Sequence, residues 1–152
     1  MPASRKPKAS ARANPSALPA SPEVPLIIRS LPPERGDVLA LLRAQALALP
    51  GVTERAVYDV FCKEWTPAYY VGERQLFHVH NFKTGLRGTV FVGVRTLLPL
   101  VLDSEEVPEE LRALAAGARG GHTKQVKVPL DTVDAVVGFL ELVRVKWRFL
   151  TG

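Results

Sequence analysis

The sequence predicts an α+β fold of two layers, in which a mostly antiparallel five-stranded sheet carries helices on one face. Two observations predict it. Apolar residues recur at helical spacing near both ends of the folded region, and between them four segments of alternating apolar and polar residues follow one another. Because short turns join these segments, neighbouring strands are expected to pair antiparallel, in the order α-β-β-β-β-α-β-α.

The first predicted helix covers residues 33–49. Pro33 stands near its first turn, and Pro50 with Gly51 ends it. Its apolar stripe consists of Val38, Leu41, Leu42, Ala46 and Leu49. This spacing is typical of an amphipathic helix that covers a sheet.

The four consecutive strands are predicted at residues 56–62, 68–71, 75–82 and 89–95. Residues 83–88 contain two glycines and predict a hairpin loop longer than the tightest type. A regular hairpin around that loop would place His80 near Phe91 and His78 near Gly93. In the last of these strands the valines at 90, 92 and 94 are expected to point inward, and Thr89, Phe91 and Gly93 outward.

The remaining elements are a short helix at residues 108–116, a fifth strand at 124–130 and a long final helix. Pro108 and the two acidic residues after it suit a helix start, and Gly117 suits its end. Val126 and Val128 alternate with polar residues in the strand. Asp131 is the expected N-cap of the final helix, which is so apolar that it must be largely buried.

The chain divides into a tail, residues 1–33, and one domain, residues 34–152. The tail holds 8 of the 13 prolines and none of the 11 aromatic residues, so it predicts a disordered basic arm. Within it, residues 24–28 are expected to be an extended segment lying against the domain. Of the net charge of +5, residues 1–24 contribute +3, so the domain itself is nearly balanced.

Composition also excludes several classes of protein. No apolar run approaches the ~18 residues of a membrane span, so no membrane partner is expected. A single cysteine, Cys62, cannot form an internal disulfide and favours a reducing, cytoplasmic location. No cofactor is implied, since residues 117–124 lack the glycine-lysine-serine/threonine ending of a phosphate loop.

The pattern His78-Val79-His80 is the sharpest local feature. Alternate residues of a strand project to the same side, so the two imidazoles can share a metal ion. Zinc normally takes three or four protein ligands, and only Cys62 and His122 are available as further ligands beside the two histidines. The alternative is a pair of half-exposed strand residues. We therefore expect a ligand-binding surface formed by His78, His80, Phe91 and His122, and leave the metal open.

Basic residues suggest a second kind of partner. A sheet face with aromatic rings and cations at its rim is typical of surfaces that stack nucleobases and contact phosphates. The candidate nucleic-acid-binding residues are Arg5, Lys6, Lys8 and Arg12 in the tail and Lys83, Arg87, Arg119 and Lys124 in the domain. The competing interpretation is an apolar face that the tail or a second copy covers, which predicts a homodimer through the open sheet face.

No catalytic residue is predicted. The chain has no Gly-x-Ser-x-Gly elbow, and Cys62 is expected to be a small buried hydrophobe in a strand. Asp59 and Glu64 stand five residues apart, a spacing that does not imply that they point together. A binding domain is therefore favoured over an enzyme.

The segment Ala46-Leu-Ala-Leu-Pro-Gly-Val-Thr-Glu54 resembles the start of YjbR/MmcQ-like domains. The order of elements from about residue 38 to 150 is similar to that family and to the related YdhG-like domains. The family's Gly-His, Asn-Lys and His-Trp pattern is matched in part by Gly121-His122-Thr123-Lys124, while Gln125-Val126 replaces His-Trp. The resemblance implies a small α+β fold, in a family some of whose members have been proposed to bind DNA.

Together these observations predict a small binding domain that contacts nucleic acid through its arm and basic loops. The alternatives are a small-ligand or metal-binding domain built on His78 and His80, or a dimerising structural module.

Overall fold

The computed structural model describes residues 20–152. Its helices are α2 (Val24–Ser30), α3 (Pro33–Leu47), α4 (Leu97–Asp103), α5 (Glu109–Ala116) and α6 (Val133–Thr151). Its strands are β1 (Val52–Asp59), β2 (Glu64–Val71), β3 (Arg74–Phe82), β4 (Gly85–Gly93) and β5 (Thr123–Pro129).

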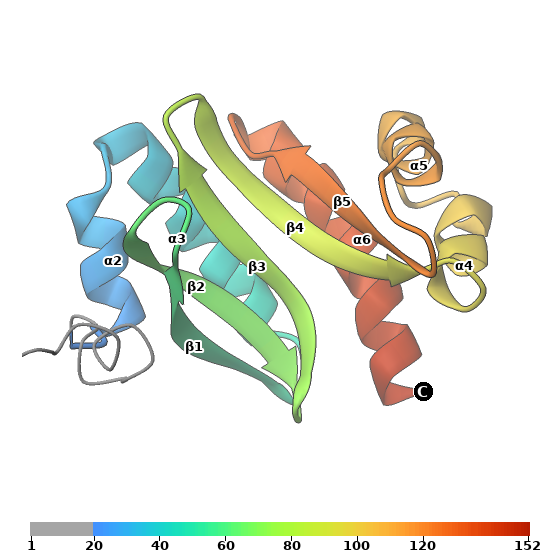
Figure 1. The fold of residues 1–152 in the computed structure, drawn as a ribbon, viewed down its shortest axis with the longest axis horizontal. Coiled ribbons are helices and arrows are strands. Elements are labelled where there is room, and N and C mark those ends of the chain that lie inside the picture. Colours follow the sequence, from blue (N-terminus) through green and yellow to red (C-terminus); the bar gives the residue numbers. More distant parts are fainter. Residues whose placement is uncertain (1–19) are drawn as a thin grey trace, which may run out of the picture.

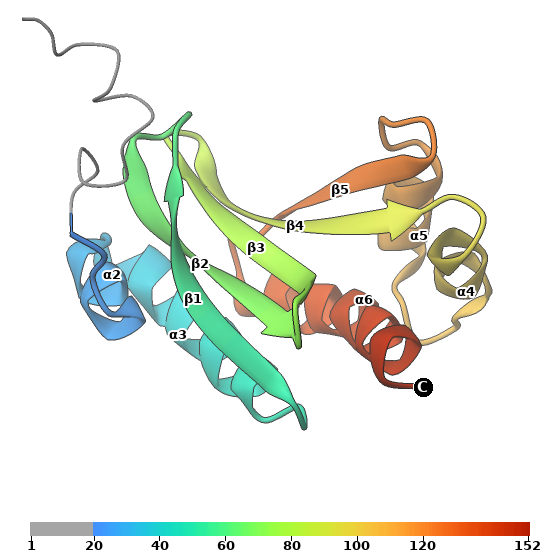
Figure 2. The same ribbon diagram turned by 60° about the horizontal axis from the view of Figure 1, so that its bottom comes forward.

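The five strands form one sheet in the order β1-β2-β3-β4-β5, and every neighbouring pair is antiparallel. Helices α3 and α6 lie across one face, while α4 and α5 pack at the β4–β5 end (Figures 1 and 2). The α+β fold and the strand order are therefore confirmed. Among residues 20–152 no helix lies over the other face, which we call the open face.

Two helices were not expected from the sequence. Residues 24–30 form α2 instead of an extended segment, with Pro25 in its first turn and Val24 and Ile27 buried where α2 packs against α3. Helix α4 lies in the connection between β4 and β5 and buries Leu97 and Val101. Both have only seven residues, so neither extends over the several turns that make helical periodicity visible.

The core lies between the helix-covered face of the sheet and the two long helices, α3 and α6. Val79, Val90 and Val92 are fully buried there. The predicted inward direction is confirmed for Val90 and Val92, whereas the third valine of that set, Val94, lies beyond the end of β4 and is only partly buried. Phe77 of β3 meets Phe139 of α6 edge to face, with ring centroids 5.3 Å apart. Val94 packs against the same cluster from just beyond β4.

The β3–β4 hairpin is tighter than predicted. Phe82 pairs with Gly85, so the loop contains only Lys83 and Thr84. The register is therefore His78 opposite Thr89 and His80 opposite Arg87, and the expected pairs with Gly93 and Phe91 are wrong.

The second glycine of that segment belongs to the strand and serves packing. A Cβ on Gly88 would lie 2.5 Å from Cζ of Phe139. Only glycine lets the ring approach the sheet this closely, so a residue that indicates a loop in the sequence marks a close contact in the structure.

Other boundaries also differ from the prediction. β1 begins at Val52 instead of residue 56, and β2 begins at Glu64 instead of residue 68. β1 ends at Asp59, so Cys62 lies in the β1–β2 turn and not in a strand. The N-cap of α6 is Thr132 instead of Asp131, because the Thr132 hydroxyl accepts a hydrogen bond from the backbone N–H of Ala135 at 3.1 Å.

Candidate ligand and metal site

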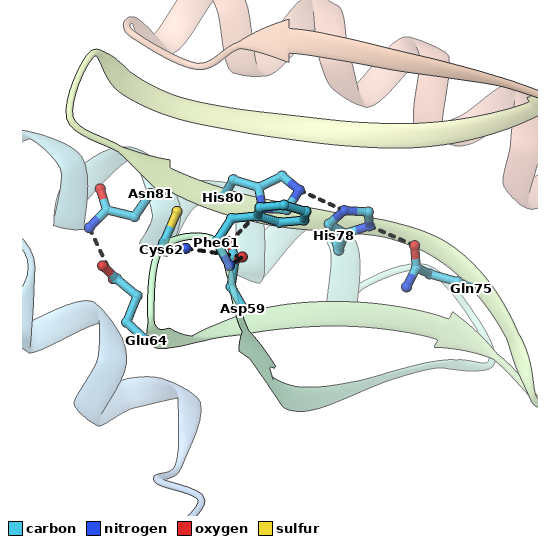
Figure 3. A network of polar contacts seen from close by, with 8 residues as sticks. All are labelled: Asp59, Phe61, Cys62, Glu64, Gln75, His78, His80 and Asn81. Carbon is cyan, nitrogen blue, oxygen red and sulfur yellow. Dashed lines mark hydrogen bonds and ion pairs between the residues drawn. The ribbon is translucent and has the colours of Figure 1, made fainter. Parts of the chain in front are cut away.

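His78 and His80 lie side by side on β3 and point toward the open face (Figure 3). Val79 between them is buried on the helix side, as alternation along a strand requires. The two rings meet edge to face, with their Nε2 atoms 2.9 Å apart. The expectation that the two imidazoles share a side is confirmed.

Asp59 fixes the ring of His80 from the end of β1. Its Oδ2 accepts a hydrogen bond from His80 Nδ1 at 2.6 Å, while Oδ1 accepts from the backbone N–H groups of Phe61 and Cys62 at 2.9 and 3.3 Å. The side chain is only 4% exposed. Burial opposes ionisation of this carboxyl, but the hydrogen bonds from His80, Cys62 and Phe61 hold its pKa below the ordinary value.

Gln75 fixes the ring of His78 from the other side. His78 Nδ1 lies 2.7 Å from Gln75 Oε1. Residues three apart on a regular strand point to opposite faces, but β3 carries a bulge: Tyr69 pairs with Phe77 and Tyr70 pairs with Gln75, so Leu76 is the extra residue. The bulge brings Gln75 to the same face as His78.

One tautomer arrangement of these hydrogen bonds leaves a place for a cation between the rings. If each Nδ1–H donates to its oxygen, both Nε2 atoms carry lone pairs, and two lone pairs repel one another at 2.9 Å. A proton shared by the two imidazoles removes the conflict, and so does a metal ion. Burial, and then the charge of His80, lower the pKa of His78 to about 4.

The surroundings of the pair are aromatic, with one free hydroxyl. The ring of Phe91 lies 5.6 Å from that of His78, and the ring of Phe82 is stacked 5.2 Å from that of His80. Thr89, opposite His78, is 1% exposed and its hydroxyl has no hydrogen-bond partner. Phe91 therefore does adjoin the histidines, although its register differs from the prediction.

Cys62 lies beside Asp59 but is a poor nucleophile. Burial, and then its hydrogen bond to Asp59, raise the pKa of its thiol to about 11, so the thiolate is scarce at neutral pH.

The basic residues predicted to bind nucleic acid do not gather in one place. Lys83 and Arg87 lie at the β3–β4 hairpin, where they line a shallow hollow with Phe82 and Lys127. Arg119 and Lys124 lie at the opposite end of β4 and β5, and the ammonium of Lys124 is hydrogen-bonded to the backbone oxygen of Ala116. The tail residues Arg5, Lys6, Lys8 and Arg12 lie outside the described residues.

His122 does not join the other two histidines. It is exposed just before β5, at the end where Gly93 pairs with Thr123, whereas His78 lies opposite Thr89. Within residues 20–152 no three His, Cys, Asp or Glu side chains come together as a metal cluster. The pair of Nε2 atoms would therefore offer a metal ion only two protein ligands.

Comparison with known proteins gives no relative from which a function could be transferred. No family model, curated protein or solved structure matches the chain. The resemblance to YjbR/MmcQ-like and YdhG-like domains therefore stays a prediction. In the described part of the chain, no helix has both the length and the apolar character needed to cross a membrane. A single chain leaves the homodimer untested, and it too stays a prediction.

Sequence reasoning missed Asp59 and Gln75 as partners of the histidines. In the sequence Glu64 is the next acidic residue after Asp59, yet Glu64 accepts a hydrogen bond from Asn81 and does not contact the two histidines. The predicted strand 56–62 places Asp59 in mid-strand, and only the end of β1 at this residue puts it before a turn, where aspartate often accepts backbone N–H groups. Gln75 depends on a bulge that no residue type in β3 announces.

Proposed function

We propose that the protein binds a transition-metal ion through Nε2 of His78 and Nε2 of His80 on the open face of its sheet. The observation that carries this proposal is the convergence of the two Nε2 atoms at 2.9 Å while each Nδ1 is held by an oxygen. Neutral imidazoles with Nδ1–H bound to a carboxylate or an amide oxygen are oriented as metal ligands are in proteins.

The distances suit such an ion after a small movement. Two zinc–nitrogen bonds of about 2.0–2.1 Å at a tetrahedral angle separate the nitrogens by about 3.3 Å. The rings therefore need to move apart by only about 0.4 Å from their present 2.9 Å. Asp59 and Gln75 would stay where they are and keep the rings in orientation.

The chemistry of the donors selects the kind of ion. Imidazole nitrogen suits Zn²⁺, Ni²⁺ and Cu²⁺, with Cu²⁺ bound most tightly, whereas Mg²⁺ and Ca²⁺ prefer oxygen. Two protein ligands leave the other coordination positions to water or to a small ligand on the open face, beside Phe91 and the Thr89 hydroxyl. The proposed role is binding, and no catalytic residue is assigned.

Titration calorimetry of the full chain with Cu²⁺, Ni²⁺, Zn²⁺ and Mg²⁺ tests the proposal. We expect affinity in the order Cu²⁺ above Ni²⁺ and Zn²⁺, with no Mg²⁺ binding, and a loss of at least about tenfold in H78A and in H80A. Asp59→Asn should weaken binding by about 10- to 100-fold, because the ring of His80 loses its carboxylate.

His122→Ala is the matched control, since it removes the exposed third histidine and should leave the affinity unchanged. The proposal is wrong if the wild-type chain binds none of the three transition metals at about 1 mM. It is equally wrong if His122→Ala lowers the affinity as much as the two β3 variants do.

A second candidate function is nucleic-acid binding at the β3–β4 hairpin. The observation that favours it is the hollow in which Lys83, Arg87 and Lys127 surround Phe82, with the guanidinium of Arg87 5.8 Å from the centre of that ring. Cations that meet phosphates beside an aromatic ring that stacks on a base are the usual parts of single-strand sites.

Fluorescence anisotropy with a labelled single strand and a labelled duplex tests this candidate at about 50 mM salt. We expect binding that weakens steeply with salt and that Arg87→Glu reduces, while Arg112→Glu on α5 leaves it unchanged. If neither nucleic acid binds at this salt concentration, the candidate is rejected.

A further inference from the structure

A second concave site lies where β3 and β4 separate. Their pairing ends at His78 and Thr89, and beyond that point the two strands diverge above α6 (Figure 2). The gap contains a cleft of about 340 Å³ whose lining includes Arg74, Lys146, Phe91, Leu97, Phe149 and Leu150. It is separate from the two Nε2 atoms, although Gln75 and Phe91 border both places.

Two cations in this cleft have no carboxylate partner. Lys146 reaches it from α6 with only 8% of the residue exposed, and its ammonium donates to the backbone oxygen of Phe91 at 2.7 Å. Neither Lys146 nor Arg74 forms an ion pair with an acidic side chain of residues 20–152. An ammonium has three donors, so two remain free in a place that water reaches poorly.

The two charges also act on one another. Burial, and then the charge of Arg74, lower the pKa of Lys146 to about 8. A buried cation next to a second cation is unfavourable unless an anion joins them. The described residues supply no such anion. A negatively charged group of a ligand would therefore interact favourably with both cations.

The remaining lining is apolar and aromatic. Phe149 lies under the guanidinium of Arg74, with 5.9 Å from Cζ to the ring centre, and Phe91 and Leu97 form other parts of the wall. A cavity of about 150 Å³ accepts benzene. A volume of about 340 Å³ therefore accommodates a ring, a short linker and a carboxylate.

We propose that this cleft binds a small organic acid, its carboxylate between Lys146 and Arg74 and its apolar body against Phe91, Leu97 and Phe149. A carboxylate matches the planar guanidinium of Arg74 and takes the free donors of Lys146. The apolar walls favour an organic acid over a bare inorganic anion. The inference goes beyond the metal site and does not depend on it.

Calorimetry with 3-phenylpropanoate tests the proposal, with 3-phenylpropanamide and inorganic phosphate as comparison ligands. We expect the carboxylate to bind at least about tenfold more tightly than either, because the amide lacks the charge and phosphate lacks the apolar body. In nuclear magnetic resonance spectra, addition of the acid should shift the backbone amide of Gly93, which lines the cleft.

Variants of the two cations locate the site. Arg74→Gln and Lys146→Met should each lower the affinity at least about tenfold, whereas Arg119→Gln, a cation outside the cleft, should not. Arg74 is exposed, so the Arg74→Gln variant should fold even if the variant of buried Lys146 does not.

Three results would overturn the proposal. They are equal affinity for the amide, equal affinity for phosphate, and an Arg74→Gln variant that binds like the wild type. H78A separates the two sites, because it should weaken metal binding at least about tenfold and leave acid binding intact.

Discussion

Asp59 stabilises the β1–β2 turn and the ring of His80 with a single side chain. Truncation to alanine removes three hydrogen bonds and leaves the donors of Phe61, Cys62 and His80 without an acceptor. We expect Asp59→Ala to lower the free energy of unfolding by about 2–3 kcal/mol, measured by urea denaturation of the metal-free protein.

The amide variant separates the two roles of this carboxylate. Asp59→Asn keeps an oxygen for the backbone N–H groups and loses the charge beside His80, so it should destabilise the protein less than alanine does. A loss below about 0.5 kcal/mol in Asp59→Ala would mean that water replaces these contacts at no cost.

Lys146 makes stability depend on pH in the alkaline range. Its pKa is about 8 in the folded protein and 10.5 in the reference state, so between these values the unfolded chain binds more protons than the folded one. Stability linked to Lys146 therefore rises from pH 8 to pH 10.5, by up to about 3 kcal/mol. Below pH 8 Lys146 is charged in the folded and the unfolded chain alike, so its effect on stability no longer changes with pH.

The difference between wild type and Lys146→Met measures this effect. Cys62 and Tyr69, whose pKa values burial raises, act in the opposite direction in both proteins and cancel in the difference. Denaturation at pH 7, 8, 9 and 10 should show the wild type gaining stability relative to the variant. A difference that does not change with pH would show that Lys146 has an ordinary pKa.

At the scale of elements, the contact between β4 and α6 depends on Gly88. A methyl group at this position would lie 2.5 Å from Cζ of Phe139, and that ring is itself fully buried against Phe77. We expect Gly88→Ala to destabilise the protein by about 1–3 kcal/mol through overpacking, measured by thermal or urea unfolding. Gly121→Ala is the matched control, since its added methyl meets nothing within 4 Å and should change stability little.

The sequence was sufficient for the strands and the long helices because their patterns are local. The alternation around Val90 and Val92 and the stripe of α3 each follow from one element alone. The features of the fold that the sequence does not predict depend on contacts between elements. Gly88 indicates a loop in the sequence, whereas in the structure it is a strand residue that leaves room for Phe139 of α6.

The same reason explains which parts of the site were predictable. The shared side of His78 and His80 follows from alternation within β3. Their partners do not, because Asp59 comes from β1, Gln75 from a bulge, and Lys146 crosses from the helix layer to β4. Side chains that come from different elements have no characteristic spacing in the sequence, so their contacts cannot be recognised there.

At the scale of the whole molecule, charge is distributed unevenly along the chain. Four of the positive charges, at residues 5, 6, 8 and 12, precede the described part and have no acidic residue among them. Residues 20–152 therefore carry a net charge of only +1. A domain this close to neutral attracts a polyanion weakly over distance, whatever the local arrangement at its hairpin.

This distribution predicts where any affinity for nucleic acid originates. Deletion should stop at residue 19, because Val24 is already buried in α2 and a longer deletion would disturb the fold. Each phosphate contact contributes about −0.9 to the slope of log K against log salt on duplex DNA. Loss of four cations should therefore reduce the slope by about 3 to 4, and binding at about 150 mM salt should largely disappear.

Anisotropy titrations of the full and shortened chains at several salt concentrations measure both the slope and the affinity. An unchanged slope would instead assign the contacts to Lys83, Arg87 and Lys127 at the hairpin, because these are the cations that the shortened chain retains around Phe82.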